Sequence, residues 1–303
     1  MIGSEFTFVI YFYYLTCIVI LMYVLIKLVA IPKPILNNVK QLKYYVKKHK
    51  KIGHRGYTNN VAENTLKAVD YVASLQDKAI EVDVHCTKDK TLILMHDDTV
   101  DRTTDGHGFV VNLTTKKIEQ LNACSKFNHS NCSFNCNCKV PTLEQVIKKC
   151  IKNEIYIFFD IRITNEYVIR DLLYYYKKYP YLYSHSVLCA FDWIFIRKMR
   201  SLDNEIVAGL TYEYMFKHYK TNIFNFLIFA IIEFFHKISL YVMSAVIGNS
   251  FLLLENKYIN MPIILISNYF DLDVIFWTVN DMATKKKIKE YGAAYMTDVH
   301  DKL

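Results

Sequence analysis

The pattern of hydrophobic and polar positions divides the chain into an uncharged N-terminal run and a long region of short alternating segments. In that region, apolar runs rich in Val, Ile and Phe alternate with stretches whose apolar positions recur at helical spacing. Strands are predicted at residues 51–56, 79–86, 92–96, 154–162, 186–192, 206–211, 274–279 and 294–297. Helices are predicted at residues 64–75, 143–151, 166–178, 193–202 and 282–291. Strands that alternate with helices over about 250 residues predict an α/β protein with a (β/α)8 TIM-like barrel.

The N-terminal run predicts a transmembrane anchor at residues 1–30. Phe6 to Ile26 is 21 residues long and carries no charge, and about 20 apolar residues cross a bilayer as a helix. The run has no polar face, which argues against a helix packed on a protein core. No small-residue cleavage site follows it, which argues against a signal peptide that is removed. We therefore expect a single-pass integral membrane protein with one N-terminal transmembrane helix.

The positive charge of the chain is concentrated just after this run. The formal charge of the 303 residues is +8, and residues 27–51 hold eight Lys and no Asp or Glu. These Lys and the single Glu5 before them account for +7, which leaves +1 for residues 52–303. The main domain is therefore not basic, and we expect no nucleic acid partner. We interpret residues 31–50 as a basic juxtamembrane linker and residues 51–303 as the barrel domain.

Two features of the sequence disagree about which side of the membrane the barrel occupies. The Lys-rich segment after the anchor favours the cytoplasmic side, because positive charge beside a transmembrane helix is retained there. Three Asn-x-Ser/Thr triplets favour the lumenal side, since only lumenal Asn residues receive N-linked glycans. The triplets begin at Asn112, Asn128 and Asn131. We expect an endomembrane location, in the endoplasmic reticulum, and both orientations stay open.

Charged side chains gather at the carboxyl ends of the first four predicted strands, where a TIM barrel carries its functional residues. They are His54, Arg55, Glu81, Asp83, His96, Asp160 and Arg162. Glu81 and Asp83 are two residues apart in one strand, so both carboxylates point to the same face. Each residue alone has an ordinary explanation as a packed side chain, a helix cap or a surface charge. Together they bring three carboxylates to one barrel mouth, which requires a cation. His85 is expected in the loop beyond the strand.

A series of short motifs runs in order along residues 51–303. The motifs are His54-Arg55-Gly56, Glu63-Asn64-Thr65, Glu81-Val82-Asp83, Thr87-Lys88-Asp89, His96-Asp97, Arg102-Thr103-Thr104-Asp105-Gly106, Pro141-Thr142-Leu143-Glu144, Trp277-Thr278-Val279-Asn280 and Met296-Thr297-Asp298. Their order and spacing resemble the glycerophosphodiester phosphodiesterase family, and so many motifs together are specific where one alone is not. The resemblance implies that residues 51–303 are the catalytic domain of a phosphoric diester hydrolase. The anchor and Cys136-x-Cys138 further resemble a small membrane-anchored animal branch that acts as a lysophospholipase D.

The residue types at the strand ends fit the chemistry that this resemblance implies. Cleaving a phosphodiester requires a proton acceptor, a proton donor and counter-charge for the phosphoryl oxygens. His54 and His96 are the expected acid and base. In the family, a hydroxyl beside the phosphoester attacks phosphorus to give a cyclic phosphate that water then opens. Arg55 and Arg162 are expected to bind phosphate oxygens, because a planar guanidinium matches that anion.

One divalent cation, Mg²⁺ or Ca²⁺, is the expected cofactor, since hard cations prefer oxygen ligands. The expected ligands are Glu81, Asp83 and Asp160, with His96 as a further candidate. Glu63 and Trp277 are expected to support the site at the barrel mouth. The family commonly has Glu-x-Lys where this chain has Asp160-Ile161-Arg162, so metal affinity and phosphate position are expected to differ from the family pattern.

Three functions are compatible with these residues. The first is a lysophospholipase D that hydrolyses a lysophospholipid, such as lysophosphatidylcholine or an N-acyl glycerophosphoethanolamine, to lysophosphatidic acid and a headgroup alcohol. The second is a phosphodiesterase for water-soluble glycerophosphocholine. The third is a catalytically inactive barrel that binds lipid. The expected partners are a lysophospholipid or glycerophosphodiester substrate and the lipid bilayer.

An apolar insertion is predicted at about residues 221–254. Glu233, His236 and Lys237 divide it into pieces of about ten residues, which are too short to span a bilayer as helices. The insertion is therefore expected to be re-entrant or interfacial, so that it offers an acyl chain a dry path to the site. The alternative is an oversized helix packed on the barrel.

Four cysteines lie close together in one loop of the predicted barrel domain. They are Cys124, Cys132, Cys136 and Cys138. Their spacing is not an established zinc spacing, although zinc remains an alternative. Free thiols are expected if the domain is cytosolic, whereas two disulfides fit a lumenal domain.

Overall fold

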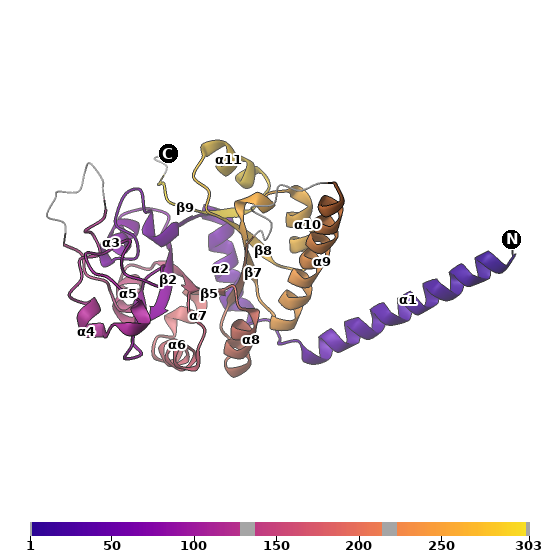
Figure 1. Ribbon diagram of the computed structural model, residues 1–303, viewed down its shortest axis with the longest axis horizontal. Coiled ribbons are helices and arrows are strands. Elements are labelled where there is room, and N and C mark those ends of the chain that lie inside the picture. Colours follow the sequence, from indigo (N-terminus) through magenta and orange to yellow (C-terminus); the bar gives the residue numbers. More distant parts are fainter. Residues whose placement is uncertain (1, 128–136, 214–222, 301–303) are drawn as a thin grey trace.

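The computed structural model describes residues 2–127, 137–213 and 223–300 (Figure 1). Within these residues, eight parallel strands form a closed barrel, because β1 pairs with both β9 and β2. The barrel strands are β1 (Lys51–Gly53), β2 (Ala79–Cys86), β4 (Tyr156–Ile161), β5 (Ser186–Ala190), β6 (Ala208–Tyr212), β7 (Phe251–Glu255), β8 (Asp273–Trp277) and β9 (Ala294–Thr297). The predicted TIM-like barrel is confirmed.

Helices follow the strands and cover the outside of the barrel (Figure 1). The α-helices of the barrel domain are α3 (Leu66–Ala73), α4 (Thr115–Ile118), α5 (Leu143–Lys152), α6 (Glu166–Lys178), α7 (Tyr181–His185), α8 (Trp193–Leu202), α9 (Ile223–Ile247), α10 (Met261–Tyr269) and α11 (Met282–Glu290). Short 3-10 turns are η1 (His54–Gly56), η2 (Val110–Asn112) and η3 (Asn256–Tyr258). Polar side chains fix where several helices begin, since Thr142, Asn165 and Asp192 accept hydrogen bonds from the first-turn N–H groups of α5, α6 and α8.

The barrel strands differ from the predicted strands in two places. β3 (Leu92–Leu94) is antiparallel to β2 and forms a hairpin with it, so the strand predicted at 92–96 is not part of the barrel. The missing barrel strand is β7, which the hydrophobic pattern does not separate from α9. The apolar run continues on both sides of the turn at residues 248–250, so helix and strand look like one insertion. Residues 251–254 therefore belong to the barrel wall.

His85 lies inside β2, and the expectation that it belongs to a loop beyond the strand is wrong. The hairpin with β3 pairs His85 with Ile93 and so extends β2 past the point where the barrel wall ends. The His85 ring is buried, and its Nδ1 accepts a hydrogen bond from the backbone N–H of Cys86 at 2.8 Å. His85 therefore has a structural position in the hairpin.

The base of the barrel is closed by α2 (Leu36–His49), which lies within the basic segment 31–50. The apolar side of α2 packs against side chains from the amino ends of the strands. This cluster includes Val39, Leu42, Tyr45, Val46, Ile52, Phe158, Phe251, Ile275 and Met296. Because α2 fills the base, open space in the barrel remains at the carboxyl ends of the strands.

α1 (Ile2–Val29) projects away from the barrel (Figure 1). Its C-terminal end lies beside the C-terminal end of α9. Within the described part of the chain, its residues Tyr11–Val29 are a candidate membrane span, because they are apolar and none is buried against the rest of the protein. This helix agrees with the expected position of the anchor. Its length and composition are typical of a helix that crosses a bilayer once.

The segment after α1 is tied to the end of α9. The backbone N–H of Ile31 donates to the carbonyl oxygen of Val246 at 2.9 Å. The buried guanidinium of Arg200 donates to the carbonyl oxygens of Pro32 and Ile247, both at 2.7 Å. Gly248 has a φ of +62°, and a Cβ there would lie 2.2 Å from the Ile31 carbonyl oxygen. A glycine is therefore required at this junction.

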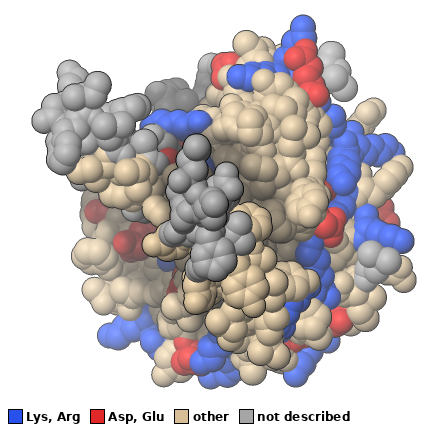
Figure 2. All heavy atoms as spheres, turned by 90° about the vertical axis from the view of Figure 1, so that its right-hand side faces the viewer, with Lys and Arg blue, Asp and Glu red and all other residues tan. Residues whose placement is uncertain are grey.

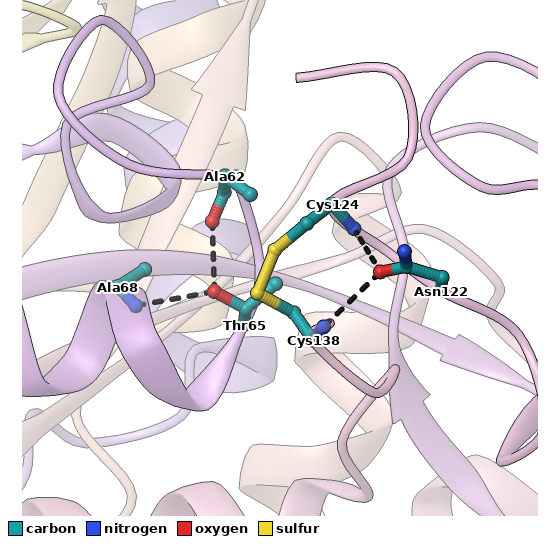
Figure 3. The surroundings of a disulfide bond; sticks show 6 residues. All are labelled: Ala62, Thr65, Ala68, Asn122, Cys124 and Cys138. Carbon is teal, nitrogen blue, oxygen red and sulfur yellow. Dashed lines mark hydrogen bonds between the residues drawn. A yellow bond between two sulfur atoms is a disulfide. The ribbon is translucent and has the colours of Figure 1, made fainter. Parts of the chain in front are cut away.

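A disulfide lies in the excursion between β3 and α5, at the rim of the barrel. It joins Cys124 and Cys138, close to the start of α3 (Figure 3). The side-chain oxygen of Asn122 accepts hydrogen bonds from the backbone N–H groups of both cysteines, at 3.0 and 3.1 Å. This disulfide is one of the two that are expected for a lumenal domain. The other two cysteines of the loop, Cys132 and Cys136, lie outside the described residues.

Candidate active site

A cavity of about 430 Å³ opens at the carboxyl ends of the barrel strands. It is lined by His54, Arg55, Glu81, Asp83, His96, Asp160, Arg162, Phe191, Thr211, Glu213, Leu253, Trp277 and Met296. The seven charged residues singled out from the sequence all belong to this lining. β1, β2 and β4 deliver most of them, because their carboxyl ends are neighbours in the closed barrel.

Three buried carboxylates form the floor of the charged half of this cavity. One oxygen each of Glu81, Asp83 and Asp160 lies within 4.8 Å of the others. Glu81 accepts a hydrogen bond from the backbone N–H of Arg55 at 2.8 Å, which fixes its position. Asp160 accepts one from Arg162 at 3.0 Å, while its Oδ1 is buried without a hydrogen-bond partner among the described residues.

Asp83, the remaining carboxylate of the cluster, is held by Asn64. The Asn64 amide donates to Asp83 Oδ2 at 2.7 Å, and its Oδ1 accepts from the Asp83 backbone N–H at 3.1 Å. Asn64 is itself buried, so this two-point contact is shielded from water. Asn64 belongs to the motif Glu63-Asn64-Thr65, but its contact with Asp83 is not predicted from the sequence.

Burial and mutual repulsion disfavour the ionised form of these carboxylates in the absence of a cation. Burial, then the charges of Asp83 and Asp160, raise the pKa of Glu81 well above its ordinary value. Burial, then the charge of Asp83, raises the pKa of Asp160 to about 6. A cation relieves both effects, because it replaces the lost hydration and neutralises the repulsion. The oxygen-only donor set with an unpaired buried Asp160 oxygen therefore fits one hard divalent cation.

His54 is held by an aspartate from the other end of the chain. Its Nδ1 lies 2.7 Å from Asp298 Oδ1, and its Nε2 lies 4.0 Å from Glu81 Oε2. Although burial opposes ionisation, hydrogen bonds from His54, Asn280 and Thr58 lower the pKa of Asp298 to about 2. A permanently charged Asp298 keeps the proton of His54 on Nδ1 and leaves Nε2 to face the cavity.

His96 has the same arrangement with its neighbour in the chain. Its Nδ1 lies 2.6 Å from Asp97 Oδ1, and Asp97 accepts two hydrogen bonds from Arg102. Burial lowers the pKa of His96 below its ordinary value, an effect that Arg55 strengthens and Asp83 opposes. His96 is therefore neutral near pH 7, with Nε2 able to accept a proton.

Arg55 and Arg162 bring positive charge to the same cavity. Arg55 lies 3.1 Å from Glu63 Oε1 and 3.3 Å from Asp83 Oδ2. Glu63 does not line the cavity; it accepts hydrogen bonds from both Arg55 and Arg102. Glu63 therefore bridges the two arginines beside the site.

The remaining wall of the cavity is largely apolar. Its apolar members are Phe191, Leu253, Trp277 and Met296, from β5, β7, β8 and β9, and its polar members are Thr211 and Glu213 at the end of β6. The rings of Phe191 and Trp277 meet edge to face, with centroids 6.0 Å apart, and the Trp277 Nε1 donates to the Leu253 carbonyl oxygen at 3.2 Å. Of the four apolar side chains, Trp277 is the one predicted from the sequence to support the site.

A parallel barrel whose mouth combines an acidic cluster suited to a divalent cation, two Asp-paired histidines and two arginines is typical of metal-dependent phosphodiesterases. The profile of the Glycerophosphoryl diester phosphodiesterase family matches residues 54–302. Glycerophosphodiester phosphodiesterase 1 of Homo sapiens is 30% identical over 263 residues, which cover 82% of this chain and 77% of that protein. The chain therefore belongs to the glycerophosphoryl diester phosphodiesterase family and is a phosphoric diester hydrolase.

Solved structures agree with this assignment at the level of the fold. A glycerophosphoryl diester phosphodiesterase described as putative, from Silicibacter pomeroyi, has a TM-score of 0.66 at 16% identity and covers 82% of this chain and 89% of its own. A phosphodiesterase from Oleispira antarctica in complex with the product sn-glycerol-3-phosphate has a TM-score of 0.63 at 18% identity, covering 82% and 92%.

Proposed function

We propose that the chain is a membrane-anchored lysophospholipase D, which hydrolyses a lysophospholipid to lysophosphatidic acid and the headgroup alcohol. The observation that supports this most directly is the division of the cavity into a strongly charged half and a half that is apolar apart from Thr211 and Glu213. The charged half suits a phosphodiester, and the apolar half suits the beginning of an acyl chain. A candidate span at Tyr11–Val29 would keep the barrel at the surface that contains such lipids.

The proposed chemistry uses the two histidines as a proton acceptor and a proton donor. The free hydroxyl of the lysophospholipid glycerol attacks phosphorus, and its proton passes to the Nε2 of one histidine. The bond from phosphorus to the headgroup oxygen breaks, and the other histidine gives that oxygen a proton. Water then opens the resulting cyclic phosphate with the two roles reversed. His96, neutral near pH 7, is the first acceptor, and His54 is the donor.

Glu81, Asp83 and Asp160 would hold the divalent cation, and the cation would supply positive charge to the phosphoryl oxygens. Arg55 and Arg162 add to that charge from the sides of the cavity. Arg162 replaces the lysine that the family commonly has here and offers a planar pair of donors, which favours a fixed phosphate orientation. Mg²⁺ and Ca²⁺ both suit an all-oxygen site.

A second candidate function is hydrolysis of water-soluble glycerophosphodiesters. The Oleispira antarctica phosphodiesterase, which shares the fold, is described in complex with sn-glycerol-3-phosphate. Such a substrate would use the charged half of the cavity and leave the apolar wall without a partner. Changing that wall therefore separates the two functions.

The test compares two single variants, Leu253→Ser and Trp277→Ala. Lysophosphatidylcholine turnover should fall about tenfold or more, because each change removes apolar contact from the acyl chain. Glycerophosphocholine turnover should fall much less, since that substrate has no acyl chain. Equal losses on both substrates would reject the acyl-chain assignment and favour the second function.

We also propose that the barrel lies on the lumenal side of an endomembrane. The Cys124–Cys138 disulfide supports this orientation, because disulfides persist in oxidising compartments and are rare in the cytosol. Asn112, which begins the first glycosylation triplet, is exposed and accessible to a glycan. The basic segment that favours the other side has a structural alternative, since its helix α2 plugs the barrel base and Lys43 pairs with Asp271 at 2.6 Å.

A further inference from the structure

The outward surface of α9 and α10 is apolar. Its exposed side chains, which we call the α9–α10 face, are Ile228, Ile231, Ile232, Phe234, Phe235, Ile238, Met261, Leu265, Ile266 and Tyr269. Figure 2 looks onto this side of the molecule with α1 directed toward the viewer, and the described part of this side is largely free of charge, with Lys and Arg gathered along its margin. Other barrel helices carry charge outward, as Lys177 on α6 and Lys287 on α11 do. The α9–α10 face therefore differs from an ordinary water-facing surface.

Three polar residues in the middle of α9, Glu233, His236 and Lys237, contact each other or side chains of the barrel. The His236 ring lies 4.5 Å from the ring of Tyr212 at the end of β6. Glu233 is largely buried and pairs with Lys237 at 3.4 Å, and Lys237 lies over the ring of Tyr258. The three polar residues that interrupt the apolar sequence therefore lie within one continuous helix, and no turn separates its two apolar parts. They also hold α9 along the barrel wall.

α9 and α10 form one continuous surface. The hydroxyl of Tyr241 on α9 lies 3.2 Å from the Ser267 hydroxyl on α10. The Tyr241 ring also stacks on Phe270, with centroids 5.4 Å apart. The outward side chains of both helices are therefore held in a fixed relation, as a docking surface requires.

The candidate span leaves the protein next to this surface. Ile31, two residues after α1, donates its N–H to Val246 near the end of α9. Figure 1 shows α1 projecting from the side of the barrel where α9 and α10 lie. A bilayer that holds Tyr11–Val29 is thus within reach of the α9–α10 face.

We propose that the α9–α10 face rests in the interfacial layer of the bilayer that holds α1, so the barrel lies with one side against lipid. The partner is the phospholipid surface itself, recognised by a wide apolar face that carries no charge. This inference rests on the proposed membrane anchoring. It deepens the proposed function, because the apolar wall of the cavity lies on the half of the barrel that α8, α9 and α10 cover. A lysophospholipid would therefore enter from the membrane side.

The test measures lipid contact in the full chain reconstituted into phosphatidylcholine vesicles. Tryptophan is introduced singly by Phe235→Trp and Leu265→Trp on the face, by Tyr174→Trp on α6 as a matched exposed control, and by Leu25→Trp on α1. Each variant is compared with wild type in vesicles whose acyl chains carry bromine either near the headgroup or near the methyl end. Bromine quenches only tryptophan that touches it. Glycerophosphocholine turnover at the wild-type rate verifies that each variant is folded.

We expect about a twofold loss of the added emission for Phe235→Trp and Leu265→Trp with bromine near the headgroup, and a smaller loss with deep bromine. Tyr174→Trp should show no loss with either lipid. Unquenched face variants beside a quenched Leu25→Trp would overturn this inference and leave the anchor intact. Stronger quenching by deep bromine would show that α9 crosses the bilayer and would also overturn it. An unquenched Leu25→Trp would remove both the anchor and the inference that rests on it.

Discussion

His54 and Asp298 are 244 positions apart in the chain, and their side chains are hydrogen-bonded with 2.7 Å between Nδ1 and Oδ1. Closure of the barrel joins them, because β9 pairs with β1 and delivers Asp298 beside the carboxyl end of β1. His96 has a matching pair with Asp97. Both histidines thus present Nε2 to the cavity with the other nitrogen already bonded.

We predict that Asp298→Asn lowers kcat about 10- to 100-fold with a nearly unchanged KM, because the amide no longer accepts the Nδ1 proton of His54 or fixes the orientation of its ring. The pKa of Asp298 is about 2, so the carboxylate is ionised throughout the working range. The loss should therefore be the same at mildly acidic and mildly alkaline pH. Steady-state kinetics test this, with Asp281→Asn at the start of α11 as a control. A loss confined to KM would contradict a positioning role.

His54→Ala and His96→Ala should each lower turnover by about 10²- to 10⁴-fold, because the loss of either partner leaves one proton transfer without assistance. Circular dichroism and thermal melting should show a folded barrel in both variants. Activity within tenfold of wild type in either variant would reject the assignment of that histidine.

Glu81→Ala and Asp83→Ala should steeply raise the cation concentration needed for activity, because each removes one oxygen from the cluster within 4.8 Å. The measurement is a titration of purified protein with Mg²⁺ and with Ca²⁺, followed by activity and by calorimetry. Glu144→Ala, which removes a half-buried carboxylate that pairs with Lys178 outside the cavity, is the control. An unchanged titration would exclude the altered residue from the ligand set.

Cation affinity should fall as the pH drops below about 6. Burial, then Asp83, raises the pKa of Asp160 to about 6, so acid protonates a ligand that the cation requires. The stability of the cation-free protein should depend on pH in the opposite direction. A carboxyl whose pKa is raised in the folded state stabilises the fold while protonated, so the cation-free protein loses that stability as the pH rises from about 4 to about 6. Asp160→Asn should remove this loss in melting experiments, and an identical pH dependence in that variant would contradict the assignment.

Asn112 should carry an N-linked glycan in cells if the barrel is lumenal, since its side chain is exposed at the end of η2. Asn112→Gln should then increase electrophoretic mobility and leave activity unchanged. The wild-type band should shift on treatment with a glycosidase. Because two further triplets lie in the chain, the comparison uses a background in which Asn128 and Asn131 are also Gln. No difference in mobility would favour the cytoplasmic side.

The charged half of the site is the part that the sequence predicts well. Glu81 and Asp83 share a face because strand geometry alternates side chains, and Asp160 pairs directly with Asp83 across neighbouring strands. Motif order then adds His54 and His96. These predictions need only local geometry and the rule that strand ends meet in a barrel.

The parts that the sequence does not predict depend on contacts between distant segments. Asp298 is recognisable in a motif, but its partner is known only once β9 and β1 close the barrel. β7 is hidden because a buried strand and an apolar helix have the same composition. The apolar wall of the cavity requires the register of β5, β7 and β8, which hydrophobicity alone does not give.

The most direct test of the proposed activity is the reaction of the purified full chain with lysophosphatidylcholine in vesicles. We predict that choline and lysophosphatidic acid appear in equal amounts, that a chelator abolishes the reaction, and that added Mg²⁺ or Ca²⁺ restores it. Release of a free fatty acid instead of choline, or no turnover with either cation, would contradict the proposal. Choline release from glycerophosphocholine alone would keep the phosphodiesterase and reject its action on lysophospholipids.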